Sequence, residues 1–246
     1  MPDHPLLPLS VHSAAPNECP RPVRLEVLSR TPLFSELPRE EIIEIEGRTQ
    51  APGYRTGEAI YRVGDGADSL FVVASGTVKL IRPSAQGARV VVSILGPGEG
   101  FGTLGTVDRY AESAEAMTVT CVVKIPARVV REVMERHPRV ALSALDEALQ
   151  RLERSQQAIE RLSVGKAGKR VSAALLALAD KVGYPEADRI DLVVPLTRTD
   201  LASMARTTPE TVSRVLSRLR HEGVVDFGRR WTSVVDRSRL AMIAAE

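Results

Sequence analysis

The chain has 246 residues, a net charge of +2 and 43% hydrophobic residues. This length and apolar fraction indicate two domains with packed cores. Only two cysteines occur, Cys19 and Cys121, so no disulfide framework is implied. The longest strongly apolar stretch, 171–179, is too short to span a bilayer. We therefore expect a cytoplasmic protein without a membrane segment.

The amino-terminal segment is rich in proline. Six prolines fall within the first 22 residues, and no basic stretch is followed by an apolar core. This pattern is typical of a disordered tail rather than of a secretion signal, and we assign residues 1–24 to it. Cys19 is expected to lie in this tail. Cys121, within an apolar run, is expected to be a buried core thiol rather than a redox switch.

Short β-rich runs dominate the next part of the chain. A helix is predicted near 38–46, and glycine-containing turns then separate short apolar runs from 51 to 125. Many short strands with regular turns favour a β-sandwich or barrel. The clearest predicted strands are 70–73, 78–81, 90–95 and 117–123.

A long helix is predicted at about 139–164, and we assign residues 136–164 to it as a dimerisation helix. Its apolar residues recur at steps of 3, 4, 3 and 7, with Gln156 at the intervening position; they are Leu142, Leu145, Leu149, Leu152 and Ile159. This is the seam of a coiled coil over about three heptads. The alternative is an amphipathic helix that lies on its own β-domain.

Two short helices are predicted in the last part of the chain. The segment 197–200 has the form of a capping box, with Asp200 in place of the preferred glutamate. After a short turn, Thr208 is suited to cap a second helix, and Pro209 fits its first position, where no N–H is needed.

The start of this second helix carries side chains that can bind DNA bases. Glu210, Ser213 and Arg214 share one helix face. A carboxylate can accept from cytosine, an arginine can bind guanine, and a serine can contact either, as the N-terminal end of a helix in the major groove requires. The alternative is a solvated helix face with one chance salt bridge.

Two predicted strands, 224–227 and 231–235, follow the helix and complete a winged helix-turn-helix, which we assign to residues 165–246. From residue 166 onward there are 14 Lys and Arg against 10 Asp and Glu, so the basic excess lies in this part. The residues expected to contact DNA are Thr197, Thr199, Thr208, Glu210, Thr211, Ser213, Arg214, Arg218 and Arg230.

Two motifs of the β-rich part resemble those of a known family. The segment 64–76 resembles the β-roll signature of cyclic-nucleotide-binding domains, and 101–105 with 112–114 resembles their phosphate-binding cassette. Together with the winged helix, this layout resembles the CRP/FNR superfamily of bacterial transcription regulators. The resemblance implies an α+β fold: an N-terminal β-roll (jelly-roll) sensor domain at 25–135, a long dimerisation helix and a C-terminal winged helix-turn-helix. It also implies a homodimer that binds double-stranded DNA and works with RNA polymerase.

The same resemblance implies an effector pocket. In cAMP-binding members, a cassette glutamate binds the ribose and an arginine binds the cyclic phosphate; here Thr103 and Glu112 stand at these positions. Losing two charge-assisted bonds of roughly 1.5–3 kcal/mol each weakens binding about 10³-fold, so cAMP is disfavoured. The expected pocket residues are Gly102, Thr103, Leu104, Glu112, Ser113, Ala114 and, for coupling to the long helix, Ser155 and Gln156.

Other effectors follow from other branches of the superfamily. The four-cysteine iron–sulfur cluster of the FNR branch is excluded within one chain, because only two cysteines are present. Haem that senses nitric oxide or carbon monoxide stays possible, as does a regulator without any effector. The candidate haem ligands are His4, His12, His137, His221, Cys19 and Cys121.

The residues 210–214 fit the Glu-x-x-Ser-Arg motif of the FNR branch. The resemblance therefore implies a palindromic operator like TTGAT-N4-ATCAA, with Arg214 on the guanine and Glu210 opposite the cytosine. Arg206 stands in the turn where many members have glycine, so we expect strain if that position needs a positive φ. An enzyme is not expected, because no nucleophile–base arrangement or P-loop is present. A cyclic-nucleotide-binding module without DNA function is the remaining alternative.

Overall fold

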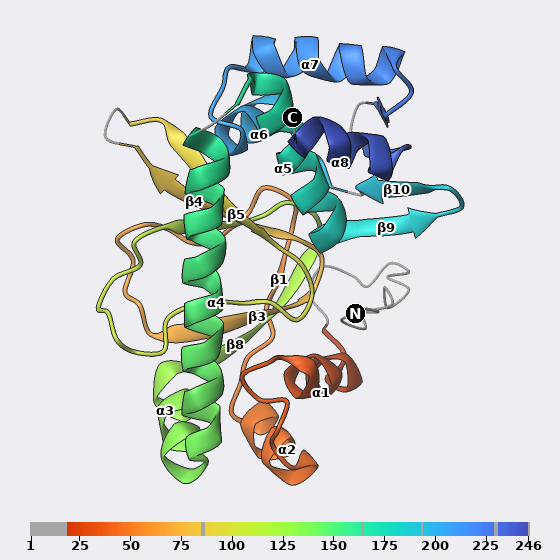
Figure 1. Cartoon of the computed structure of the whole chain (residues 1–246). Helices are drawn as coiled ribbons and strands as arrows, with labels where there is room; N and C mark the ends of the chain where they lie inside the picture. Colours follow the sequence, from red (N-terminus) through yellow and green to blue (C-terminus); the bar gives the residue numbers. More distant parts are fainter. Residues whose placement is uncertain (1–18, 85–86, 164, 193, 229–230, 246) are drawn as a thin grey trace. The chain divides into compact units, whose positions relative to one another are not determined.

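The computed structural model describes residues 19–84, 87–163, 165–192, 194–228 and 231–245. The chain divides into two compact units, one made of Met1–Leu80 and Leu95–Arg151, the other of Ile81–Ile94 and Leu152–Glu246 (Figure 1). Within the described ranges, no helix is both long and apolar enough to cross a membrane. The predicted α+β fold, with a β-roll followed by a winged helix-turn-helix, is confirmed.

The β-roll consists of two four-stranded sheets. In spatial order, the first sheet contains β1 (Gly53–Tyr54), β8 (Thr120–Pro126), β3 (Ser69–Ser75) and β6 (Gly100–Gly102). The second contains β2 (Ala59–Tyr61), β7 (Ser113–Ala116), β4 (Val78–Pro83) and β5 (Arg89–Leu95). The two long strands β3 and β8 pair antiparallel, and Val72 lies opposite Val123.

The strand β3 is buried on both faces, because successive side chains of a strand point to opposite sides. Phe71 and Val73 belong to a core in the interior of the roll, which residues of both sheets form. Leu70 and Val72 belong to a second core, which residues of the helices complete. This explains why β3 reads as a continuous apolar run rather than as an alternating one.

Four helices accompany the β-roll: α1 (Arg21–Arg30), α2 (Arg39–Gly47), α3 (Ala127–Arg136) and α4 (Pro138–Ser163). Each helix contributes buried residues to the second core, for example Val27 from α1, Ile42 from α2, Val130 from α3 and Val140 from α4. The predictions of a helix near 38–46 and of a long helix at about 139–164 are confirmed, with boundaries that differ by one residue.

Two details of the sequence interpretation are wrong in this part. The predicted tail, 1–24, overlaps α1, which begins at Arg21, and Cys19 is buried rather than part of a tail. In α1 the buried residues are the adjacent Val27 and Leu28. Because they do not recur at helical spacing, the helix has no apolar face that the sequence could indicate. The predicted strand 117–123 begins too early, because 117–119 form a bend and the strand, β8, runs from Thr120 to Pro126. Residues 1–18 lie outside the described residues.

The winged helix-turn-helix contains α5 (Ala167–Val182), α6 (Arg198–Met204), α7 (Pro209–His221) and α8 (Arg237–Ala245). Its four strands form a sheet in the order β11 (Val225–Phe227), β12 (Thr232–Val234), β10 (Arg189–Leu192) and β9 (Gly183–Glu186). The two predicted wing strands are confirmed within one residue at each end. The β9–β10 hairpin and α8 were not predicted.

Candidate DNA-binding surface and effector pocket

Both helices of the helix-turn-helix begin at the predicted caps. The Thr197 hydroxyl accepts a hydrogen bond from the Asp200 backbone N–H at 3.0 Å, and the Asp200 carboxylate accepts from the Thr197 N–H at 3.1 Å. At α7, the Thr208 hydroxyl accepts from the Thr211 N–H at 3.3 Å, and Pro209 is the first helical residue. These caps satisfy N–H groups that the helix itself cannot pair, so they fix where α7 starts.

The helix α7 is amphipathic, and this fixes which face it presents. Val212, Leu216 and Leu219 are fully buried, and they pack α7 into the core of the unit. The exposed face carries Glu210, Ser213 and Arg214. Burial at helical spacing therefore leaves the predicted base-reading residues together on the outside.

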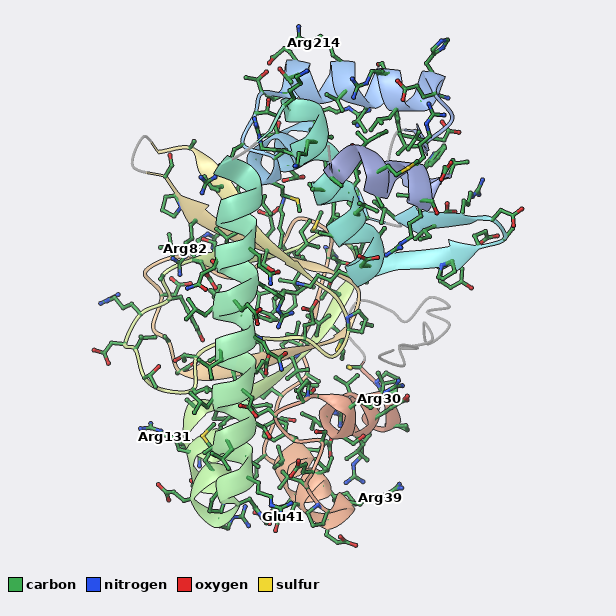
Figure 2. The ribbon with its side chains drawn as sticks, in the orientation of Figure 1. Arg30, Arg39, Glu41, Arg82, Arg131 and Arg214 are labelled. Atoms are coloured by element: carbon green, nitrogen blue, oxygen red, sulfur yellow. The ribbon has the colours of Figure 1, made fainter. Side chains whose placement is uncertain are left out.

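The predicted reading residues are held by short local contacts. The Ser213 hydroxyl donates to the Pro209 carbonyl at 2.9 Å, and Nη2 of Arg214 donates to the Thr211 hydroxyl at 3.1 Å. Figure 2 shows Arg214 at the outer side of α7, pointing away from the protein. A guanidinium in this position presents several donors to a ligand, and only one of them is bound within the chain.

Glu210 is prepared to act as an acceptor. A hydrogen bond from the Thr208 hydroxyl, assisted by its own backbone N–H and by the charge of Arg214, lowers the pKa of Glu210. The carboxylate is therefore ionised at neutral pH. An ionised carboxylate accepts hydrogen bonds and donates none, as the amino group of cytosine requires.

The turn between the two helices is strained and braced. Arg206 has φ of +45°, so the strain expected from the sequence is confirmed. From α5, Arg170 donates to the carbonyls of Ala205 at 2.9 Å and of Arg206 at 3.3 Å, and also to that of Gly165 at 2.7 Å. Arg170 was not predicted. Its contact with the turn spans 35 residues, and nothing in the local sequence of α5 distinguishes it from a solvated arginine.

The basic residues around α7 differ in how they are engaged. Arg218 is exposed and lies 3.8 Å from the Glu222 carboxylate. Arg220 pairs with Asp226 at 2.9 Å and lies over the Phe227 ring. The guanidinium of Arg198 lies 4.5 Å from the centre of the same ring, and burial lowers its pKa. Thr199 is exposed, and Arg230 lies outside the described residues.

Polar side chains of the β-roll cassette form hydrogen bonds within the chain. Thr103 is buried, and its hydroxyl accepts from the Gly105 N–H at 3.0 Å. The Ser113 hydroxyl accepts from the Val63 N–H at 3.0 Å. Gly102 has φ of +95°, and a side chain there would meet the Ser69 carbonyl at 2.6 Å. Both hydroxyls that are expected to contact an effector thus accept a hydrogen bond from a backbone N–H within the chain.

The remaining cassette residues do not converge on one cavity. Leu104 packs against the core beneath the helices, whereas Ala114 lies in the interior of the roll. That interior is occupied by aromatic rings: Tyr61 stacks on Tyr110 with ring centres 3.8 Å apart, and its ring centre lies 5.5 Å from that of Phe71.

Glu112 influences this aromatic cluster. Burial, and secondly the negative charge of Glu112, raises the pKa of Tyr61. The charge of Glu112 therefore acts on a buried ring of the β-roll interior.

The long helix contacts the strand that leads into the cassette. From α4, Nη2 of Arg151 donates to the Gly100 carbonyl at 2.6 Å and pairs with Glu147. Arg151 was expected only as a flanking charge. Ser155 and Gln156 are exposed residues of α4 and belong to the second unit.

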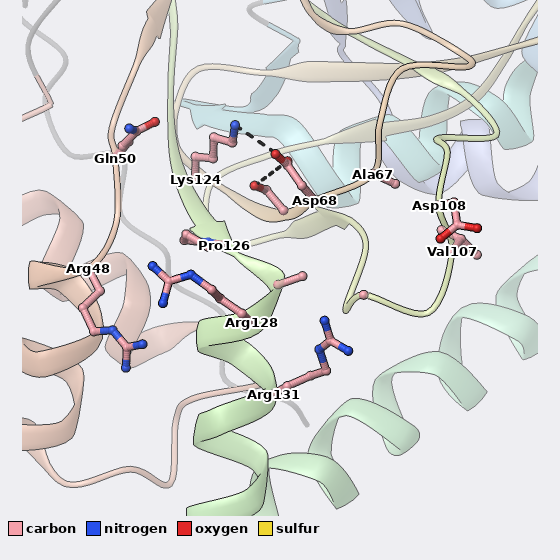
Figure 3. Close-up of a pocket in the computed structure, with 13 residues that line it drawn as sticks. Arg48, Gln50, Ala67, Asp68, Val107, Asp108, Lys124, Pro126, Arg128 and Arg131 are labelled. Atoms are coloured by element: carbon pink, nitrogen blue, oxygen red, sulfur yellow. Dashed lines mark hydrogen bonds and ion pairs between the residues drawn. The ribbon is translucent and has the colours of Figure 1, made fainter.

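A cavity of about 650 Å³ lies elsewhere on the β-roll, where β8 leads into α3 (Figure 3). It contains none of the predicted pocket residues; its charged lining is Arg48, Asp68, Asp108, Lys124, Arg128 and Arg131. Several of these charges are paired: Lys124 lies 3.8 Å from Asp68, and Arg48 pairs with Glu132. Gly105, the last residue of the segment 101–105, also lines the cavity, so the cavity borders the cassette without containing the residues expected to bind an effector.

The candidate histidine ligands lie on different elements, whereas Cys19 and Cys121 are both buried in the core beneath the helices. His137 caps the end of α3 and lies 3.3 Å from Glu41, whereas His221 lies in the last turn of α7. His4 and His12 lie outside the described residues. Among the residues that the structure describes, no three His, Cys, Asp or Glu side chains gather as a metal site would require.

Known proteins resemble both parts of the chain. Residues 53–137 match the family described as cyclic nucleotide-binding domain, and residues 169–243 match the Crp-like helix-turn-helix domain. The "Cyclic AMP receptor protein" of Thermus thermophilus is 33% identical over 216 residues, which cover 87% of this chain and 97% of the relative. The "Nitrogen fixation regulation protein FixK" of Rhizobium meliloti is 30% identical, over 76% of this chain and 87% of the relative.

Solved structures agree with these relatives. FixK2 from Bradyrhizobium japonicum is 25% identical, with a TM-score of 0.72 over 80% of this chain and 98% of that one. The fold is therefore shared along most of the chain. The chain belongs to the CRP/FNR family of transcription regulators.

Proposed function

We propose that the chain is a homodimeric, sequence-specific DNA-binding regulator that reads a palindromic operator like TTGAT-N4-ATCAA through α7. The exposed group of Glu210, Ser213 and Arg214 on the first two turns of α7 carries the proposal. Arg214 would bind the guanine of each half-site, and Glu210 would accept from the cytosine. Other residues would contact the DNA backbone and fix the position of the protein along the operator. They are Thr197, Thr199, Thr208, Thr211, Arg218 and Arg230.

The proposed dimer rests on the apolar seam of α4. Leu142, Leu145, Leu149 and Leu152 are between 54% and 61% exposed in the single chain. Four leucines at coiled-coil spacing on one exposed helix face favour pairing with a second copy over packing on the chain's own β-domain. A twofold axis between two such helices would present two reading helices to half-sites about one helical turn apart.

The cassette supports an effector other than cAMP, or none. Thr103 and Ser113 use their hydroxyls within the chain, and Glu112 places a negative charge where a phosphate would bind. If an effector exists, Arg151, which contacts Gly100, and the neighbouring Ser155 and Gln156 would couple it to α4. As a regulator, the protein would act in the cytoplasm with RNA polymerase and without enzymatic activity of its own.

The direct test is fluorescence anisotropy of the ligand-free protein on the TTGAT-N4-ATCAA duplex and on a scrambled duplex, at one salt concentration near physiological. We expect selective binding to the palindrome, by about 10³-fold or more. Equal, weak binding to both duplexes, in protein whose absorption spectrum shows no haem, would mean either that an effector is missing or that the operator is wrong.

A second candidate function is cyclic-nucleotide sensing. It is favoured by the name of the Thermus relative, a cyclic AMP receptor protein, and by the match to the cyclic nucleotide-binding domain. A calorimetric titration with cAMP distinguishes the two candidates. Micromolar affinity would support cAMP as the effector, whereas no heat of binding at millimolar cAMP supports the proposal above.

A further inference from the structure

The two cysteines of the chain meet in the structure. Cys19 and Cys121 are separated by about a hundred residues, yet both are buried in the core formed by β3, β8 and the helices. The two side chains also shift each other's pKa, which is lowered at Cys19 and raised at Cys121. The only two thiols of a chain of 246 residues thus lie in the same buried core cluster, as a dithiol pair requires.

The surroundings of Cys19 hold it against the β-roll. Nη1 of Arg24 donates to the Cys19 carbonyl at 2.6 Å, and Nε of Arg24 donates to the buried Glu46 carboxylate at 2.8 Å. Nε of Arg21 donates to the other oxygen of Glu46 at 2.9 Å. Two arginines of α1 thus anchor the segment to α2, but only Arg24 also contacts Cys19.

The opposite partner is fixed in the sheet. Cys121 lies on β8 opposite Gly53 of β1, and its sulfur is 4.0 Å from the Ala51 carbonyl. Cys19, by contrast, precedes α1 and lies outside any helix or strand. A disulfide would therefore join the segment before α1 to a strand of the sheet, and it requires the Cα atoms of the two cysteines to lie within about 7 Å of each other.

The two thiols also differ in reactivity. The hydrogen bond from Cys121, opposed by burial and assisted by the positive charge of Arg24, lowers the pKa of Cys19. The hydrogen bond to Cys19 and burial raise the pKa of Cys121. Cys19 is therefore the more acidic of the two thiols, and we expect it to react first with an oxidant while Cys121 resolves the product.

We propose that Cys19 and Cys121 form a reversible intramolecular disulfide, so that the junction of α1 and β8 is an oxidant-responsive modification site. With hydrogen peroxide, the Cys19 thiolate attacks one oxygen and becomes a sulfenic acid, and the hydroxide released takes up a proton to form water. Cys121 then attacks the Cys19 sulfur, and the second hydroxide leaves with the Cys121 proton as water. Two thiols and one peroxide thus yield one disulfide and two waters. A small-molecule disulfide such as oxidised glutathione does the same by exchange and leaves as two thiols.

The test treats the full-length protein with hydrogen peroxide or oxidised glutathione, followed by thiol titration in denaturant and peptide mapping without reductant. We expect both thiols to disappear together, one linked peptide that contains Cys19 and Cys121, and recovery of both thiols with dithiothreitol. On a non-reducing gel the chain should keep its monomer size. Cys19→Ser should keep its one remaining thiol under the same treatment.

Other products would overturn the proposal. Cross-linked dimers, over-oxidised Cys19 beside a free Cys121, separate glutathione adducts on each cysteine, or two thiols that survive treatment each contradict an intramolecular pair.

A matched pair of variants tests the role of Arg24. Arg24→Gln should slow the reaction with peroxide several-fold, whereas Arg21→Gln, which removes a bond to the same Glu46, should react like the wild type. Equal slowing in both variants would mean that α1 docking, rather than the charge beside Cys19, sets the rate.

Discussion

The start of α7 and the cassette of the β-roll both carry hydroxyl and charged side chains, but they use them in opposite ways. At α7, the predicted reading side chains lie on the exposed face, and the hydrogen bonds of Ser213 and Arg214 are with residues in the first turns of the same helix. In the cassette, the hydroxyls of Thr103 and Ser113 accept hydrogen bonds from backbone N–H groups of the β-roll. The same kinds of side chain are thus left on the surface in one region and stabilise the fold in the other.

The largest expected effect concerns the number of reading helices. Leu149→Glu places a charge in the exposed seam of α4, so we expect a monomer by sedimentation. Because two linked half-site contacts become one, operator affinity should fall by about 10²-fold or more. The matched control is Gln157→Glu, which adds the same charge to α4 outside the seam. A Leu149→Glu variant that stays dimeric would contradict the proposed interface.

Arg170 comes next, because it braces the turn that sets the angle of α7. Arg170→Ala removes charged donors from the Ala205 and Arg206 carbonyls and should lower the free energy of unfolding by about 1–2 kcal/mol. Urea unfolding measures this loss. Arg170→Lys keeps the charge but not the forked geometry, so near-wild-type stability of this variant would show that charge alone is sufficient.

A pair of substitutions tests the contrast itself. Thr103→Val removes the acceptor of the Gly105 N–H and should cost about 1 kcal/mol of stability without changing DNA affinity. Ser213→Ala should do the reverse, weakening DNA binding by about 1 kcal/mol without changing the urea midpoint. If the two variants exchanged these effects, the assignment of both sites would be wrong.

The smallest expected effect is a gain. Arg206 holds a left-handed backbone conformation that costs a non-glycine residue about 1 kcal/mol. Arg206→Gly should relieve most of this cost, less the greater entropy that glycine loses on folding, and raise the urea midpoint slightly. A lower midpoint would show that the arginine side chain stabilises the turn.

Local signals explain what the sequence predicted well. Thr208, Pro209 and the 197–200 capping box act within one helical turn, so the start of each DNA-binding helix could be predicted to the residue. The helix α4 could be predicted equally well, since its leucines recur at a regular helical spacing. The exposed position of Glu210 and Ser213 followed from the spacing of Val212, Leu216 and Leu219.

The unpredicted features depend on contacts between distant residues. The strand β9 contains Gly183 and Pro185 and shows no alternation, and it forms because β10 pairs with it. Arg170, Arg151 and the contact between Cys19 and Cys121 each join segments that lie far apart along the chain. The internal use of Thr103 could not be predicted either, because the motif specifies the residue type and not the partner of its hydroxyl.

The most direct test of the account is a double-mutant comparison of Arg214 with its proposed base. Anisotropy would be measured for the wild type and Arg214→Ala on the palindrome and on a duplex with the guanine of each half-site replaced. We predict that the wild type loses about 1–3 kcal/mol per contact on the altered duplex, and that Arg214→Ala binds both duplexes equally. If Arg214→Ala lost affinity but discriminated between the duplexes as well as the wild type, α7 would not read that base through Arg214.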